Sequence, residues 1–174
     1  MTNSARPFAE MLPPMNPADD AVHEHELTYF DGSSRKVHIS QREIPYPKGR
    51  LIISRTDLNS IITHANDAFV ELSGYTREEL IGQPQCILRH PDMPRAIYQS
   101  LWETLAGDGR PKWHGYIKNL NKDGSHYWVY ATAVQNKRDG KVVGYTSVRR
   151  EMSRSKIDEM TAKYKEMIAA EGGG

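Results

Sequence analysis

The spacing of hydrophobic residues predicts strands at both ends of the main part of the chain. Two β-branched runs, LIISRTD from Leu51 and SIITHA from Ser60, predict two short strands separated by a tight turn. After residue 110 longer strands are predicted over Lys112–Asn121, Ser125–Gln135 and Lys141–Arg150. The turn sequences Lys122-Asp123-Gly124 and Asp139-Gly140 indicate that these three strands follow one another as antiparallel hairpins.

Helical signals fill the region between the two groups of strands. Residues 66–72 are predicted to form a short helix with Asn66 as its N-cap. A second short helix opens with a capping box from Thr76 to Glu79. A clearer helix is predicted over residues 95–106, where apolar residues recur at helical spacing.

This order of elements predicts an α+β fold, with a five-stranded antiparallel sheet and the short helices on one face. We expect residues 44–152 to form that domain. Residues 1–43 would be an N-terminal extension, with a mobile proline-rich tail over residues 1–22 and a short hairpin over residues 25–40.

The last segment, residues 153–174, is predicted to be an amphipathic helix followed by a short tail. Its apolar residues follow a two-heptad seam, formed by Ile157, Met160, Tyr164 and Met167. Two heptads alone are marginal in water, so something must cover the seam. It either packs back on its own domain or forms an interface with a second copy or a partner.

Composition indicates a soluble, cytoplasmic protein. The chain has 174 residues, with 23 Lys and Arg against 22 Asp and Glu, so its charge gives no sign of nucleic acid or an anionic membrane as partner. The single cysteine, Cys86, permits no internal disulfide and fits a reducing compartment. No apolar run reaches the roughly 18 residues of a membrane span.

Candidate chemistry appears first on one face of the strand predicted from residue 112. Alternation places Trp113, Gly115, Ile117 and Asn119 on the same face. Gly115 leaves room for a flat ligand, Trp113 offers a stacking surface, and Asn119 offers a donor and an acceptor. The alternative is that Trp113 is a core aromatic residue and Asn119 lies at the surface near a turn.

A second candidate is the segment ILRHPDMP, residues 87–94, in which two prolines bracket an acid. Arg89, His90 and Asp92 bring a cation, a titratable imidazole and a carboxylate close together. The prolines would fix the backbone ahead of the helix predicted from Arg95. Without further information, the three side chains could also be a surface ion-pair cluster.

Several sequence runs resemble one family of sensor domains. They are TDLNSIITHANDAFVELSGYTREELIGQP, RHPDMP, WHGYIKN and NKDGSHYWVYATA, within residues 44–152. Their order and sequence are similar to the PAS domains that form the sensory part of bacterial aerotaxis receptors. The resemblance implies a PAS fold that binds FAD non-covalently and senses the redox state of the cell. It also implies the FAD-binding residues Arg89, His90, Asp92, Trp113, Asn119 and Asn66.

The functional expectation is therefore an FAD-binding redox sensor that relays the state of its flavin to a partner protein. We expect a homodimer that acts on a signalling partner in trans, or the sensory part of a longer receptor, and no enzymatic activity. FAD carries an anionic pyrophosphate, for which Arg89 is a natural charge partner. His90 would donate to phosphate or ribose, and Asp92 would hold Arg89 or His90 or contact a polar edge itself.

Other readings find less support in the residues. The sequence around Cys86 lacks the Asn, Phe and Gln of the flavin-reactive motif Asn-Cys-Arg-Phe-Leu-Gln in blue-light LOV domains, so a buried structural cysteine is favoured. No G-x-G-x-x-G follows a strand, and no metal-ligand cluster or catalytic triad is apparent. The alternative function is a cofactor-free or haem-binding PAS module for dimerisation or ligand sensing.

Overall fold

The computed structural model describes residues 6–107 and 109–172, and it confirms the α+β class. A five-stranded antiparallel sheet has the order β4-β3-β7-β6-β5. Its strands are β3 (Ile52–Asp57), β4 (Ile62–Ala65), β5 (Lys112–Leu120), β6 (His126–Arg138) and β7 (Lys141–Arg150). Both predicted hairpin turns are confirmed, because β6 pairs in antiparallel register with β5 on one side and β7 on the other.

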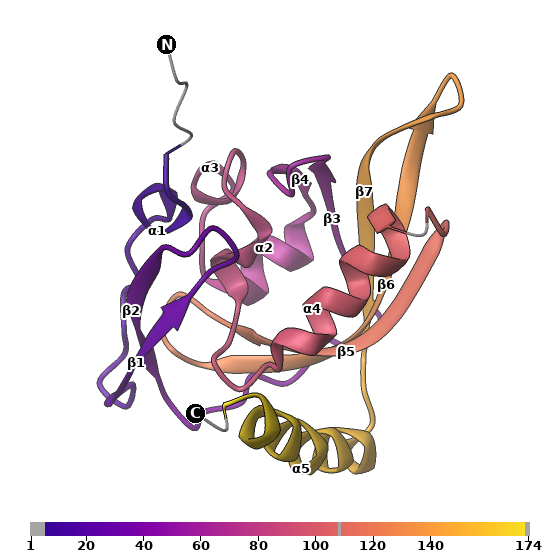
Figure 1. Ribbon diagram of the computed structural model, residues 1–174. Helices are drawn as coiled ribbons and strands as arrows, with labels where there is room; N and C mark the ends of the chain where they lie inside the picture. The colour runs from indigo at the N-terminus through magenta and orange to yellow at the C-terminus, as the bar shows by residue number, and fades with distance from the viewer. Residues whose placement is uncertain (1–5, 108, 173–174) are drawn as a thin grey trace.

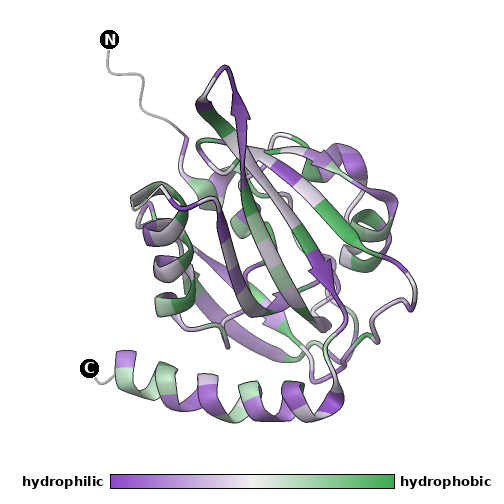
Figure 2. Ribbon diagram, turned by 90° about the vertical axis from the view of Figure 1, so that its right-hand side faces the viewer, coloured by the Kyte–Doolittle hydropathy of each residue, from purple (hydrophilic) through white to green (hydrophobic). Residues whose placement is uncertain are grey.

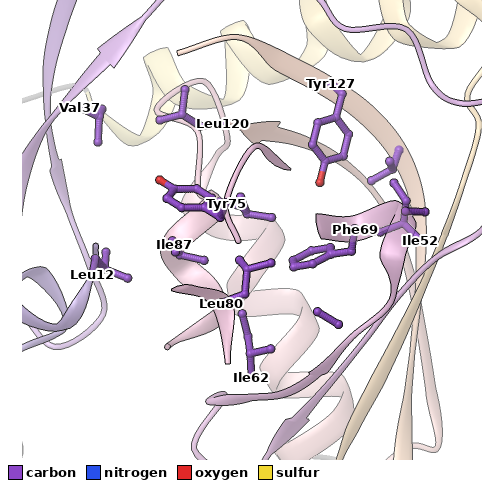
Figure 3. Packing of buried hydrophobic residues seen from close by; sticks show 14 of the residues in the cluster. Leu12, Val37, Ile52, Ile62, Phe69, Tyr75, Leu80, Ile87, Leu120 and Tyr127 are labelled. Atoms are coloured by element: carbon purple, nitrogen blue, oxygen red, sulfur yellow. The ribbon is translucent and has the colours of Figure 1, made fainter. Parts of the chain in front are cut away.

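Short helices cover one face of this sheet (Figure 1). They are α2 (Asp67–Ser73), α3 (Arg77–Leu80), a 3-10 turn η1 (Gln85–Leu88), α4 (Arg95–Trp102) and a π turn η2 (Glu103–Gly107). Local signals set their starts as predicted, since Asn66 accepts a hydrogen bond from the Phe69 amide and Thr76 forms a capping box with Glu79. The main hydrophobic cluster lies between these helices and the sheet, and Figure 3 shows Phe69 and Leu80 within it.

The N-terminal lead-in differs from the predicted mobile tail. It contains α1 (Phe8–Met11), β1 (His23–Thr28) and β2 (Ser34–Ile39), so the predicted hairpin is confirmed. Leu12 and Val37 are buried in the same cluster as the domain core (Figure 3). The amides of Asn16 and Ala18 donate to backbone carbonyls of the β5–β6 turn. The prolines therefore direct a segment across the domain, where Leu12 and Ala21 are buried.

The C-terminal helix α5 (Arg154–Glu171) resolves the alternative for its apolar seam. Ile157, Met160 and Tyr164 are buried on the chain's own domain, packed with Trp128 and Met93. The Tyr164 hydroxyl also donates to a β5 backbone carbonyl at 2.6 Å. Apolar and polar residues alternate along this helix, which runs beneath the sheet (Figure 2). The structure thus covers the seam without a second chain.

The far end of α5 reaches the start of α4. Both carboxylate oxygens of Glu171 accept backbone hydrogen bonds there, from the amides of Arg95 at 3.0 Å and Ala96 at 2.8 Å. A carboxylate at this position satisfies helix amides that otherwise lack partners and complements the helix dipole. Across the described residues, no helix combines the length and the apolar character that a membrane crossing requires.

Candidate functional site

A cavity of about 330 Å³ lies between the inner face of the sheet and the helices. This volume is near the lower end of the range for small-molecule sites. Its walls are mostly apolar, with side chains from α4, η2 and β5, including Tyr98, Leu101, Leu105, Trp113 and Ile117. Exposed side chains of the β1–β2 and β3–β4 turns, Phe30 and Leu58, also border it. The cavity therefore combines flat apolar walls with an opening between two turns.

Arg89, one of the six residues for which the resemblance implied FAD binding, lines this cavity. It follows η1 and forms an isolated backbone bridge with Asn119 on β5. Its guanidinium lies 5.1 Å from the centre of the Tyr98 ring, and its Nη1 donates a long bond of 3.4 Å to the Thr28 carbonyl. The Nε–H is buried without a partner among the described residues. Such an unpaired donor is costly unless an acceptor binds it.

Trp113 and Asn119 also line the cavity, but Gly115 has a different role from the one predicted. A Cβ atom on Gly115 would overlap the indole ring of Trp113. The space left by the missing side chain is therefore filled by Trp113 itself, and the indole N–H donates to the Ser100 hydroxyl at 3.2 Å. The glycine allows this tryptophan to lie flat on its own strand as part of the wall.

His90 and Asp92 turn away from the cavity, so the predicted three-residue clamp is not formed by side chains facing one ligand. His90 is fully buried, and its Nδ1 accepts the Asp92 amide at 3.0 Å. Asp92 has a side chain that is 62% exposed and pairs with Lys118 Nζ at 2.8 Å. Arg89 pairs with β5, and a turn at Pro91 and Asp92 follows, so the three side chains do not point to one side.

A second histidine, His126, meets His90 edge to face, with ring centres 5.9 Å apart. Burial, with a further contribution from the Lys118 charge, lowers the pKa of His90 to about 3. The same two causes lower the pKa of His126 to about 4, although Glu43 opposes them. Burial is the largest influence on the pKa of Asp92 and would raise it, but the hydrogen bond from Lys118 and the nearby positive charge together hold that pKa below its usual value. The histidine pair is therefore neutral at pH 7.

Asn66, the sixth predicted residue, does not border the cavity. Its Oδ1 accepts the amides of Ile53 and Phe69, both at 3.1 Å, and its Nδ2 donates to the Leu51 carbonyl at 2.8 Å. These bonds tie the start of α2 to β3. The structure thus gives the Asn66 amide a structural role and leaves it little capacity for a ligand.

One cavity residue, Arg149 on β7, was missed in the sequence. It is 3% exposed, and its Nη1 donates to the Ser54 hydroxyl at 2.8 Å. Its guanidinium lies 4.8 Å from the Phe69 ring centre, while Nε and Nη2 are buried without partners among the described residues. Strand alternation could have found it, because Arg149 shares the inward face of β7 with Tyr145 and Ser147.

Cys86 also borders the cavity. Burial raises the pKa of its thiol to about 12, so the group is neutral at pH 7. Among the described residues, no group of three or more His, Cys, Asp and Glu side chains could hold a metal ion.

The donor set of the cavity can be compared with the flavin that the sequence resemblance implies. Flat apolar walls suit a planar ring, and Asn119 offers an amide to its polar edge. The orphaned donors of Arg89 and Arg149 require acceptors or negative charge, and FAD carries both in its ring carbonyls and its pyrophosphate. The residues present therefore fit the group.

Comparison with known proteins supports the same family. The model of the PAS fold matches residues 62–149. The aerotaxis receptor of Escherichia coli (strain K12) is 46% identical over 132 residues, which is 76% of this chain and 26% of the receptor. A nitrogen fixation regulatory protein of Klebsiella pneumoniae is 37% identical over 103 residues, or 58% of this chain and 20% of that protein.

Among solved structures, a light-oxygen-voltage domain studied with a flavin analogue superposes with a TM-score of 0.56. It is 22% identical and covers 67% of this chain and 86% of its own, which shows a shared fold. The chain spans about a quarter of the aerotaxis receptor and a fifth of the nitrogen fixation protein. With the PAS model matching half of its length, and with the strand order and helices described above, this chain belongs to the PAS-fold family.

Proposed function

We propose that this protein is a redox sensor that binds FAD in its PAS cavity and relays the state of the flavin to a partner protein. The observation that carries the proposal is the pair of buried arginines, Arg89 and Arg149, whose unpaired N–H groups face a cavity with flat apolar walls. Relatives named as an aerotaxis receptor and as a nitrogen fixation regulatory protein favour a signalling role.

Several residues that line the cavity have a role in this proposal. Leu101, Trp113 and Ile117 would enclose the ring and exclude water from it. Arg89 would bind the pyrophosphate, because its guanidinium contacts the β1–β2 hairpin, whose exposed Phe30 borders the opening. Asn119 would hydrogen-bond the polar edge of the ring and exchange its partner when the ring changes protonation. Bound FAD would supply reversible electron transfer.

His90 and Asp92 would act through Arg89 rather than on the cofactor. The His90–Asp92 bond and the Asp92–Lys118 ion pair fix the loop that carries Arg89 to the cavity. Both residues are therefore positioning residues in this proposal.

A cytoplasmic homodimer that acts on a signalling partner in trans remains our prediction for the whole assembly. The dimer interface would lie away from the apolar seam of α5, which is already buried on its own domain. No histidine stands among the described residues that border the cavity, so a haem there would lack the usual axial imidazole.

The visible spectrum of the purified protein tests the proposal. We expect a flavin spectrum, with FAD identified after the protein is denatured and the released cofactor separated by chromatography. Apo-protein should regain the spectrum when FAD is added. A colourless protein that takes up no added FAD would disprove the proposed function, and a haem Soret band would favour the alternative.

A further inference from the structure

Two buried arginines face one cavity, and the proposed function assigns only Arg89. The Arg149 side chain donates one hydrogen bond, to neutral Ser54, and its Nε and Nη2 have no partner among the described residues, a carboxylate included. A buried cation without a counter-charge is strongly unfavourable, and burial lowers the pKa of the Arg149 guanidinium. An apolar side chain would satisfy this position better unless a ligand brings an acceptor to it.

Arg149 lies far along the sheet from the turn at Leu58, which borders the opening of the cavity. Arg149 lies opposite Ile52 in the β3–β7 register, and β3 continues from there to Asp57, just before Leu58. Five steps of extended strand amount to about 16 Å. Around Arg149 the cavity is lined by Ser54 and by Ser147 on the same strand. The guanidinium lies against the Phe69 ring, and Arg149 is 3% exposed, so this end is shielded from solvent.

The enclosed end of the cavity suits a neutral ring edge with acceptors better than a phosphate. A pyrophosphate needs water or several cations, and Arg149 is the only cation among the described residues that line this end with Ser54 and Ser147. The pyrimidine edge of a flavin presents carbonyl oxygens and a ring nitrogen, which match the donor fork of an arginine.

Resting on the proposed function, we propose that Arg149, oriented by Ser54, binds the pyrimidine edge of the flavin ring and makes the bound ring easier to reduce. Reduction adds electrons to the ring, and a fixed cation beside it stabilises the added negative charge in a site closed to water. Arg149 would thus set both the direction of ring insertion and the redox potential of the sensor, while Arg89 holds the phosphates.

Riboflavin separates the two arginines because it has the ring and lacks the phosphates. We would titrate apo-protein with riboflavin and with FAD, comparing the wild type with Arg149→Met. Because the variant loses a hydrogen bond from a charged group, the dissociation constants of riboflavin and FAD should both rise, by at least about tenfold. The factor should be similar for the two ligands. The midpoint potential of the remaining bound flavin should become more negative. Arg150→Gln, an exposed neighbour on the opposite face of β7, should match the wild type in both measurements.

The stability of the apo-protein adds a readout that a purely structural arginine would not give. Removal of an unpaired buried charge should leave the thermal midpoint of apo Arg149→Met equal to that of the wild type or higher. Arg149→Lys, which keeps the charge, should keep a midpoint potential nearer to that of the wild type than Arg149→Met does. The two variants together keep the test valid if one of them folds poorly.

Three outcomes would overturn the inference while the proposed function stands. They are unchanged riboflavin affinity in Arg149→Met, weakened binding of FAD alone, and an unchanged midpoint potential. A wild-type protein that binds neither flavin would instead refute the proposed function, and the inference with it.

Discussion

At the scale of the residue, the site consists of a few polar groups without partners in an apolar enclosure. Arg89 and Arg149 each leave a buried N–H unpaired beside the cavity. Native proteins pair nearly all buried polar groups, so unpaired ones are informative. His90 and Asp92, by contrast, need no ligand to balance a charge. Burial keeps His90 neutral, and Asp92 forms an ion pair with Lys118.

Replacement of Arg89 with glutamine should weaken FAD much more than riboflavin. The guanidinium is proposed to contact phosphate oxygens, and loss of a charge-assisted bond raises a dissociation constant by about tenfold or more. Arg138→Gln, at an exposed site in the β6–β7 hairpin, is the matched control. If Arg89→Gln lost affinity for FAD and for riboflavin equally, Arg89 would contact the flavin ring instead of the phosphates.

The histidine pair predicts loss of stability in mild acid. His90 and His126 have pKa values of about 3 and about 4 in the folded protein, below the 6.5 of an unfolded chain. The unfolded state therefore takes up protons first as the pH falls below 6.5, and the free energy of unfolding decreases from there towards pH 4. At pH 5 each histidine should cost about 2 kcal/mol relative to pH 7.5.

Denaturant titrations at pH 7.5, 6 and 5 would measure this loss. His126→Gln should show a shallower pH dependence than the wild type, and His64→Gln, at an exposed site, should show the same dependence. Equal unfolding free energies of the wild type at pH 7.5 and 5 would contradict the assignment.

At the scale of the element, the features that were predicted correctly from the sequence are those set by local signals. The Asn66 cap, the capping box at Thr76 and the Lys122–Gly124 turn need only near neighbours in the chain, and each is confirmed. The direction of the side chains in the RHPDMP segment depends on β5 behind it, and of its three predicted binding residues only Arg89 lines the cavity. Trp113 and Asn119 line it as well, whereas Asn66 does not. Arg149 could not be assigned from the sequence, because an arginine on the inward face of a strand indicates a binding site only once the cavity beside it is known.

The contact between Glu171 and α4 predicts a measurable effect at this scale. Glu171→Ala removes the acceptor of two amides at the start of α4, which should lower the free energy of unfolding by about 1 kcal/mol. Hydrogen exchange at the Arg95 and Ala96 amides should become faster, as NMR can detect. Glu166→Ala, exposed on the same helix, should leave both amides protected. Unchanged exchange in Glu171→Ala would exclude the capping role.

At the scale of the whole molecule, the N-terminal lead-in and the PAS sheet share one hydrophobic core. Leu12, Leu27 and Val37 pack in the same buried cluster as Ile52 and Phe69. Composition alone indicated a mobile tail, because prolines and few apolar residues are typical of one. The sequence could not show that those few residues reach the domain core, since that depends on contacts between distant segments.

Leu12→Ala tests whether the lead-in belongs to the folded unit. Loss of a buried leucine should lower the free energy of unfolding by about 2 kcal/mol, as measured by urea titration. Val22→Ala removes side-chain carbon atoms from a residue of the same lead-in that is 71% exposed, and it should change the free energy little. A Leu12→Ala protein as stable as the wild type would restore the mobile-tail prediction.

The place where α5 ends has a practical consequence for biosensor design. Glu171 holds that end against the first turn of α4, and α4 supplies Tyr98, Leu101 and Trp102 to the cavity wall. A fluorescent reporter joined after Gly172 would therefore begin close to the helix that encloses the ligand. Because a shift of α4 would be passed to this end of α5 through Glu171, we expect a reporter here to respond to the ligand more than one placed in the β6–β7 hairpin.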